Sequence, residues 1–234
     1  RRLISDGNSY FTEMSDIINR LEDHVASARM KTTPVIDFEK NESLKGLDYL
    51  DTIYHAIVNE HPIQLKYRSF KARSANSFIF YPYLLKEYRN RWFVYGVRGN
   101  GRILQNLALD RIQSLEVLPQ EHYIKNTFFD PNTFFDDLVG VTKNTGSVAE
   151  KVGFKVAAAE APYIITKPIH RSQQVMERLA DGSVILEIEV VINHELERVF
   201  FGYAEGIQIL YPKTLVELMG RKLKKAAEQY THSK

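Results

Sequence analysis

Two strands and the turn between them decide the fold of this 234-residue chain. The first strand has the sequence FIFYPY at residues 78–83, the turn has YRNR at 88–91, and the second strand has WFVYGVR at 92–98. Runs rich in aromatic and β-branched residues on either side of a short polar connection predict a β-hairpin. Because Pro82 has no amide proton to donate to a neighbouring strand, we expect it at a sheet edge or at a bulge.

Further elements flank this hairpin on both sides. Apolar residues at three- and four-residue spacings predict a helix, and alternation of apolar with polar residues predicts half-buried strands. The expected elements are a helix at 47–60 and strands at 63–67, 102–109 and 112–118. A helix followed by five short antiparallel strands is typical of a small β-barrel of the SH3 or Sm type.

The last third of the chain has a different order of elements. Strands are expected at 151–157, 172–179, 184–192 and 207–211, and helices at 160–166, 194–203 and 213–230. The order β-α-β-β-α-β predicts a ferredoxin-like α/β domain with one extra C-terminal helix. The predicted fold class is therefore α+β.

The remaining segments connect these domains. Residues 1–46 are expected to form a helical linker, with an amphipathic helix at 9–30 and a short strand at 35–38. Residues 121–147 are expected to form a linker helix, which covers 132–139, because Asp130-Pro131 is a favourable helix start. The barrel domain is then 47–120 and the ferredoxin-like domain is 148–234.

Basic and aromatic residues concentrate in the barrel segment. The whole chain has a net charge of +2, whereas residues 61–111 contain ten Lys or Arg against two acidic residues, and ten of the 27 aromatic residues. Cations suit phosphate groups and ring faces suit unpaired bases, so this segment favours contact with a polyanion, especially single-stranded nucleic acid. The alternative is that the rings form the core and the cations are solvated.

Signatures of catalysis are absent from the sequence. It contains no G-x-S-x-G, no phosphate-binding loop and no H-E-x-x-H, and its seven histidines are scattered. The chain has no cysteine, which excludes disulfides and thiolate ligands and fits a cytoplasmic protein. No stretch approaches the about 18 apolar residues of a membrane span. We therefore expect a protein that is not an enzyme and has no catalytic residue, no metal site, no cofactor and no membrane partner.

The barrel segment resembles the WYL domain family. Four motifs carry the resemblance: Leu65-Lys66-Tyr67, Tyr81-Pro82-Tyr83-Leu84-Leu85, Trp92-Phe93-Val94-Tyr95-Gly96 and Leu109-Asp110-Arg111-Ile112. The Trp-Phe-Val motif stands where the family has its eponymous Trp-Tyr-Leu, so a phenolic hydroxyl is lost at Phe93. The ferredoxin-like tail resembles the C-terminal extension usual in this family, especially at Phe200 to Gly206 and the following Ile207 to Pro212.

The resemblance implies the sensor part of a bacterial transcriptional regulator. An N-terminal winged helix-turn-helix would bind DNA, and because this chain would begin in the connecting helix, that domain is expected to be missing. The WYL domain would bind an anionic effector, such as single-stranded nucleic acid or a nucleotide. The alternative is a direct single-strand-binding module of a defence or repair protein, and a hydrolase or transferase with an unrecognised site is a further rival.

A homodimer is expected from the C-terminal part. The extension helps dimerisation in the family, and an apolar strand at 184–192 precedes a long helix with an apolar stripe. The stripe consists of Leu215, Leu218, Leu223 and Ala226. Small domains on a linker tend to cover such surfaces with a partner.

The candidate ligand-binding residues are aromatic and basic side chains of the barrel: Tyr67, Arg68, Tyr81, Lys86, Trp92, Arg102 and Arg111. The resemblance implies that basic residues at positions 102 and 111 line the ligand groove. In many members an arginine stands four residues before the proline of the second strand, and here Phe78 replaces it.

Several of these side chains have a second interpretation. A slip of one residue in strand phase reverses the face on which Tyr67 and Tyr81 lie. Trp92 has a favoured second interpretation as a core anchor of the barrel, and Arg111 has one as the ion-pair partner of Asp110 or another acid. The turn residues Arg89 and Arg91 are interpreted either as phosphate contacts or as simply solvated. The polar cluster 170–173 is expected to be a solvated loop, and its alternative is to complete a binding site.

Overall fold

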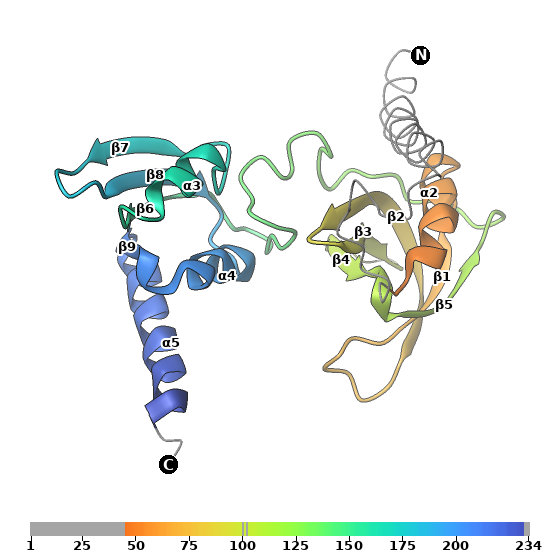
Figure 1. The fold of residues 1–234 in the computed structure, drawn as a ribbon. Coiled ribbons are helices and arrows are strands. Elements are labelled where there is room, and N and C mark those ends of the chain that lie inside the picture. Colours follow the sequence, from red (N-terminus) through yellow and green to blue (C-terminus); the bar gives the residue numbers. More distant parts are fainter. Residues whose placement is uncertain (1–44, 100, 102, 232–234) are drawn as a thin grey trace, which may run out of the picture. The chain divides into compact units, whose positions relative to one another are not determined.

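The structure is a computed structural model that describes residues 45–99, 101 and 103–231, which belong to one compact unit, Leu44–Lys234. Its first elements are a 3-10 turn and a helix, followed by five strands (Figure 1). They are η1 (Leu47–Tyr49), α2 (Leu50–Val58), β1 (Ile63–Tyr67), β2 (Asn76–Tyr88), β3 (Arg91–Arg98), β4 (Gln105–Ala108), η2 (Leu109–Arg111) and β5 (Ile112–Val117). The strands form one antiparallel sheet in the order β4-β3-β2-β1-β5.

The hairpin between β2 and β3 confirms the sequence-based prediction. Tyr88 pairs with Arg91, and the two residues between them, Arg89 and Asn90, have φ angles of 50° and 59°. Positive φ at both central residues is the conformation that matches the twist of two antiparallel strands. Sequence analysis predicted the helix at 47–60 and the strands at 63–67, 92–98 and 112–118 close to their observed bounds, whereas β2 is longer than expected and β4 is shorter.

Pro82 lies at a bulge and not at an edge. The register between β2 and β3 shifts between Pro82 and Leu84, and β2 lies between β1 and β3 in the sheet. Opposite the proline is Gly96, where a Cβ atom would lie 2.1 Å from the carbonyl oxygen of Tyr81. The strands therefore approach so closely at this point that only glycine fits.

The sheet uses its two faces differently. One face packs with Ile53 and Ala56 of α2 in a core whose other members include Ile63, Phe80 and Val94. Because successive side chains of a strand alternate, Tyr95 points to the other face. There its ring contacts the rings of the segment between the two sheets, 118–149.

The expected linker helix at 132–139 is wrong. Residues 131–137 form consecutive turns, with hydrogen bonds from Phe134 N to Asp130 O and from Asp136 N to Thr133 O. Phe134 and Phe135 are neighbours in sequence, and both rings pack against Tyr95, at 5.9 and 5.3 Å between centroids. Neighbouring residues of an α-helix point about 100° apart, so packing against one ring favours an irregular backbone over the local helix signal.

The C-terminal part forms a second antiparallel sheet, in the order β7-β8-β6-β9. Its elements are β6 (Glu150–Val156), α3 (Ala161–Thr166), β7 (Gln174–Arg178), β8 (Val184–Val190), α4 (His194–Tyr203), η3 (Ala204–Gly206), β9 (Ile207–Tyr211) and α5 (Lys213–Thr231). Its core contains Phe154, Leu186, Leu196 and Phe200. These elements match the sequence-based prediction. Over the described residues, two antiparallel sheets with four α-helices confirm the α+β class.

The N-terminal predictions, the helix at 9–30 and the strand at 35–38, lie outside the described residues. Among the helices that are described, none is long and apolar enough to cross a membrane.

Candidate functional site

Tyr67 and Arg111 meet where β1 ends and β5 begins. Tyr67 pairs with Ile112, and the amide of Arg68 donates a hydrogen bond of 3.1 Å to the carbonyl oxygen of Arg111. The Tyr67 hydroxyl lies near the Ala108 backbone and the Arg111 side chain, which both favour its charged form. Burial raises the pKa of Tyr67 and the positive charge of Arg111 partly opposes this rise, so the hydroxyl stays protonated at neutral pH.

The guanidinium of Arg111 also covers an exposed aromatic ring. Its central carbon lies 4.4 Å from the centroid of Phe70, in the loop after β1, and the Phe70 residue is 74% exposed. Such a cation–ring contact is favourable, and it leaves the outer side of the ring open to solvent. The Nε atom of Arg111 is buried and has no hydrogen-bond partner.

Asp110 lies between two arginines. Its Oδ2 is 3.1 Å from Nε of Arg91, and its Oδ1 is 3.7 Å from Nε of Arg111. Arg91 is therefore paired with an acidic residue, and the interpretation that it is simply solvated is wrong. The register that pairs Phe93 with Ala108 places Arg91, two residues before, beside Asp110, two residues after. We call the group of Tyr67, Phe70, Arg91, Asp110 and Arg111 the Arg111 cluster.

A second arginine contacts a ring in the same sheet. The guanidinium carbon of Arg98 lies 4.1 Å from the centroid of Phe78, and Arg98 is exposed. Phe78 occupies the position at which an arginine was expected from the resemblance. A cation therefore remains at this place, but it is supplied by the neighbouring strand β3.

The structure divides the seven candidate residues instead of bringing them together. Tyr67, Arg68 and Arg111 are neighbours, with Arg68 exposed. Trp92 is half-buried against the core, as its second interpretation predicted. Arg102 lies outside the described residues.

Tyr81 and Lys86 contact the segment between the sheets. The Tyr81 ring lies edge-on to that of Tyr123, with 6.0 Å between centroids, and the Lys86 ammonium lies 4.7 Å from the centroid of Phe135. Because strand side chains alternate between faces, these two residues lie on the face occupied by the segment 118–149. They are separated from the Arg111 cluster for that reason.

Sequence reasoning missed Phe70. It lies in a loop with no periodic pattern, between Arg68 and Lys71. The signal that was available is an aromatic residue in a polar basic loop, because a loop on the surface has no core to bury a ring.

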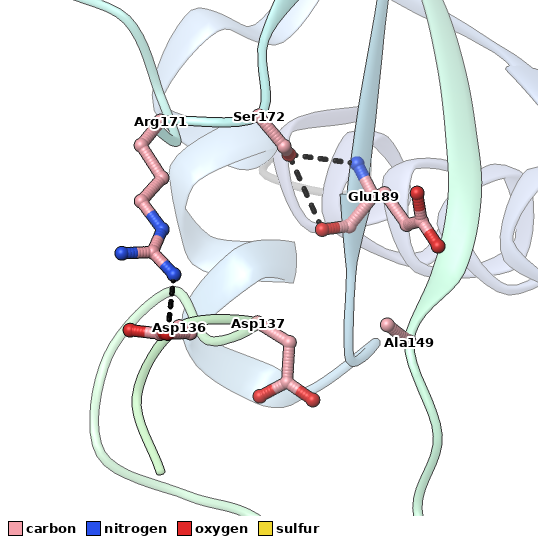
Figure 2. Close-up of a pocket in the computed structure, with 6 residues that line it drawn as sticks. All are labelled: Asp136, Asp137, Ala149, Arg171, Ser172 and Glu189. Carbon is pink, nitrogen blue, oxygen red and sulfur yellow. Dashed lines mark hydrogen bonds and ion pairs between the residues drawn. The ribbon is translucent and has the colours of Figure 1, made fainter. Parts of the chain in front are cut away.

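A pocket of about 460 Å³ adjoins the segment between the sheets (Figure 2). Its lining residues are Asp136, Asp137, Ala149, Arg171, Ser172 and Glu189. Arg171 pairs with Asp136 at 2.6 Å, and Lys143 pairs with Asp137 at 2.8 Å. Figure 2 shows the Ser172 hydroxyl bonded to the backbone of Glu189, at 2.9 and 3.2 Å. The charges of Arg171, Asp136 and Asp137 are therefore paired within the chain.

The polar cluster 170–173 is part of this packing. His170 is buried, and its Nδ1 lies 2.7 Å from Oγ of Ser172. Burial and the charge of Arg171 lower the pKa of His170, so the ring is neutral at pH 7. The solvated loop expected here is therefore wrong for His170, although Arg171 is exposed. Among the described residues, no group of three His, Cys, Asp or Glu side chains is arranged to hold a metal ion.

Two known domain families match the sequence. The WYL domain matches residues 48–117, and the WCX domain matches residues 149–227. No curated protein matches this sequence.

Several solved structures are similar to this chain, and they include the following two. Proteasome accessory factor B/C (PafBC) of Arthrobacter aurescens is 16% identical, with a TM-score of 0.33 over 82% of this chain and 28% of that chain. A CRISPR Cas-related protein is 13% identical, with a TM-score of 0.45 over 77% of this chain and 50% of that chain. This chain thus spans half or less of the length of both.

Proposed function

Because this chain belongs to the WYL domain-containing proteins, with a WCX domain after its WYL domain, we propose that it is the effector-sensing part of a transcriptional regulator. The effector is an anion, either single-stranded nucleic acid or a nucleotide, and it binds at the Arg111 cluster. A DNA-binding domain outside this sequence responds to its binding. The chain binds and signals without catalysing a reaction.

The contact between Arg111 and Phe70 carries this proposal. A guanidinium recognises phosphate with two parallel hydrogen bonds, and an exposed ring offers a face on which a base stacks. Asp110 and Tyr67 hold the guanidinium in place, which reduces the entropy lost when a ligand binds. Arg68, directly after β1, and Arg98, in β3, add positive charge at exposed positions.

The segment between the sheets supports coupling of the two domains. The carbonyl oxygen of Val141 accepts hydrogen bonds from the Tyr95 hydroxyl and from Nδ2 of Asn106, the latter at 2.7 Å. Next to it, the Thr142 hydroxyl donates to Oε1 of Glu195 in α4 at 2.8 Å. Gly140 has a φ of 99° and a Cβ there would lie 2.5 Å from Cγ of Glu195.

These contacts tie the backbone at 140–142 to β3 and β4 of one domain and to α4 of the other. An effector that prefers one arrangement of the WYL sheet shifts the position of this segment, and through it the WCX domain. This linkage is the mechanism that we propose for regulation.

The strand order favours the finer features of the fold. In the second sheet, the chain order β6-α3-β7-β8-α4-β9 and the spatial order β7-β8-β6-β9 support a ferredoxin-like domain followed by α5. In the first, the bulge in β2 lets that strand pair with β1 through its first half and with β3 through its second, which supports a strongly bent, SH3-like or Sm-like sheet.

Substitution of Phe70 tests the effector site without changing charge. We expect Phe70→Leu to weaken binding of a fluorescent oligothymidylate about 5- to 150-fold, because stacking of one base on a ring contributes about 1–3 kcal/mol. Fluorescence anisotropy measures the affinity. Phe70 is largely exposed, so the variant should unfold at the same urea concentration as the parent.

Tyr163→Leu is the matched control, because Tyr163 is an aromatic residue of α3 that is 70% exposed. This variant should bind the oligonucleotide as the parent does. Equal affinity of Phe70→Leu and the parent would remove the Arg111 cluster as the effector site.

A further inference from the structure

The C-terminal half of α5 has no core contact. Leu215 and Met219, in the first two turns, are buried against the second sheet. From Gly220 to Thr231 every residue is exposed, and Figure 1 shows this half of the helix extending beyond its sheet. A helix of this length is marginal in isolation, so a partner that it contacts would stabilise it further.

This exposed half is strongly basic. It contains Arg221, Lys222, Lys224 and Lys225 against one acidic residue, Glu228. At 100° per residue, the four cations cover one arc of about 160° of the helix surface. Lys222 is held by an ion pair with Glu197, whereas the side chains of Arg221, Lys224 and Lys225 make no ion pair or hydrogen bond with any residue that the structure describes.

The charge pattern selects among partners. A second copy of the helix would bring like charges together, which opposes association through this face. A membrane surface would need a large apolar arc opposite the cations, but that arc offers only Leu223, two alanines and Tyr230. A polymer with regularly spaced negative charges fits the cationic arc without these penalties.

We propose that the basic face of α5 binds the phosphate backbone of a nucleic acid. Its eleven exposed residues after Gly220 extend over about 16 Å, and a nucleic-acid duplex carries one negative charge per about 1.7 Å of its axis, so several phosphates lie within reach. This site lies in the WCX domain and goes beyond the effector site at the Arg111 cluster. It gives the regulator an anchor on nucleic acid that is independent of base sequence.

Substitution of two free lysines tests the proposal. The variant Lys224→Gln/Lys225→Gln removes two charges and keeps helix-favouring side chains. We expect a loss of affinity of about fivefold, because exposed charged contacts are individually weak. The slope of log affinity against log salt concentration should become shallower by about two. Each phosphate contact that is lost means that about one counterion fewer is released when the nucleic acid binds.

The probes are a fluorescein-labelled 20-base-pair duplex and one of its strands alone, measured by fluorescence anisotropy between 50 and 200 mM salt. The loss in the duplex arm identifies double-stranded DNA as the bound form, and a loss in the single-strand arm identifies single strands. Either result supports the proposal. Circular dichroism confirms that the helix content is unchanged.

The double variant Lys167→Gln/Arg178→Gln is the control. Both residues are exposed in the same domain, and this variant removes the same amount of positive charge as the α5 variant. Equal losses in the two variants would show an effect of net charge alone and overturn the proposal. Unchanged binding of nucleic acid by the α5 variant, or no binding by the parent protein, would also overturn the proposal. Tighter binding of polyglutamate than of either nucleic acid would overturn it as well, because that result would indicate an acidic protein as the partner. Phe70→Leu should leave the salt slope unchanged, which separates this test from that of the effector site.

Discussion

Two tyrosines of the first sheet illustrate how the environment of one hydroxyl decides its contribution. Tyr83 and Tyr95 are both buried and both contact rings of the segment 118–149. The Tyr95 hydroxyl donates to the Val141 carbonyl oxygen, whereas the Tyr83 hydroxyl is buried without a hydrogen-bond partner. Burial raises the pKa of both, that of Tyr83 to about 12.

Removal of these hydroxyls should therefore have opposite consequences. We expect Tyr95→Phe to lower the free energy of unfolding by about 1–2 kcal/mol, because it deletes a buried hydrogen bond. Tyr83→Phe deletes an unpartnered polar group and should leave stability unchanged or raise it slightly. Urea unfolding at pH 7 measures both variants, and a larger loss for Tyr83→Phe would contradict this assignment.

The pKa of Tyr83 also predicts a pH dependence. The unfolded chain loses this proton near the ordinary value of 10.0, and the folded chain keeps it until about 12. Stability is therefore fully present below pH 10 and falls as the pH rises from 10 to 12. Tyr83→Phe should reduce the loss of stability in this window.

At the scale of elements, one residue both begins a helix and fastens the connecting segment. Oδ1 of Asn193 accepts a hydrogen bond of 2.8 Å from the amide of Leu196, which caps α4. Its Nδ2 donates to the carbonyl oxygens of Val139 and Thr142, both at 3.0 Å. The side chain thus orders α4 and the segment 139–142 together.

Asn193→Asp should separate these two roles. A carboxylate keeps the cap but cannot donate, and it would face two carbonyl oxygens, so we expect a loss of about 2–3 kcal/mol in the free energy of unfolding. Hydrogen exchange should become faster at the Val191 amide, which donates to the Asp137 carbonyl oxygen. The exposed Asn144→Asp is the isosteric control. Similar stability losses in both variants would rule out the double role of Asn193.

At the scale of the molecule, the surface expected to form a homodimer is partly used within the chain. The strand predicted at 184–192 is β8, in the interior of the second sheet, and its inward side chains are buried. Of the predicted helix stripe, Leu215 is buried in the same domain and Leu218 is partly buried, whereas Leu223 and Ala226 are exposed. Exposed apolar side chains remain on β7, at the sheet edge, where Val175 is 43% exposed and Met176 is 53% exposed.

We therefore expect a homodimer that involves the edge strand β7. Sedimentation at micromolar concentration should show a species with twice the 27.1 kDa of one chain. Met176→Lys should shift it to the monomer, because a charge on an edge strand opposes pairing with another strand. Val148→Lys, at a residue that is 70% exposed in the connecting segment, should not. A parent protein that sediments as one chain would exclude this assembly.

The strands and turns were predictable from local patterns. The period-two alternation of β1, the polar turn at 88–91 and the missing amide proton of Pro82 each act within a few residues. The four motifs of the WYL domain follow from the sequence for the same reason, since they lie in or beside these strands. The basic and aromatic character of the segment 61–111 is likewise a property of the sequence alone.

Tertiary structure decided which of these side chains meet. The helix signal at Asp130-Pro131 is overridden because Phe134 and Phe135 both pack on Tyr95. Arg91 pairs with Asp110 because the β3–β4 register brings them together, and Phe70 joins Arg111 because the loop after β1 lies beside η2. These contacts join residues that are far apart in the chain. The free energy of each contact depends on distance and burial in the folded state, and a local sequence pattern specifies neither of them.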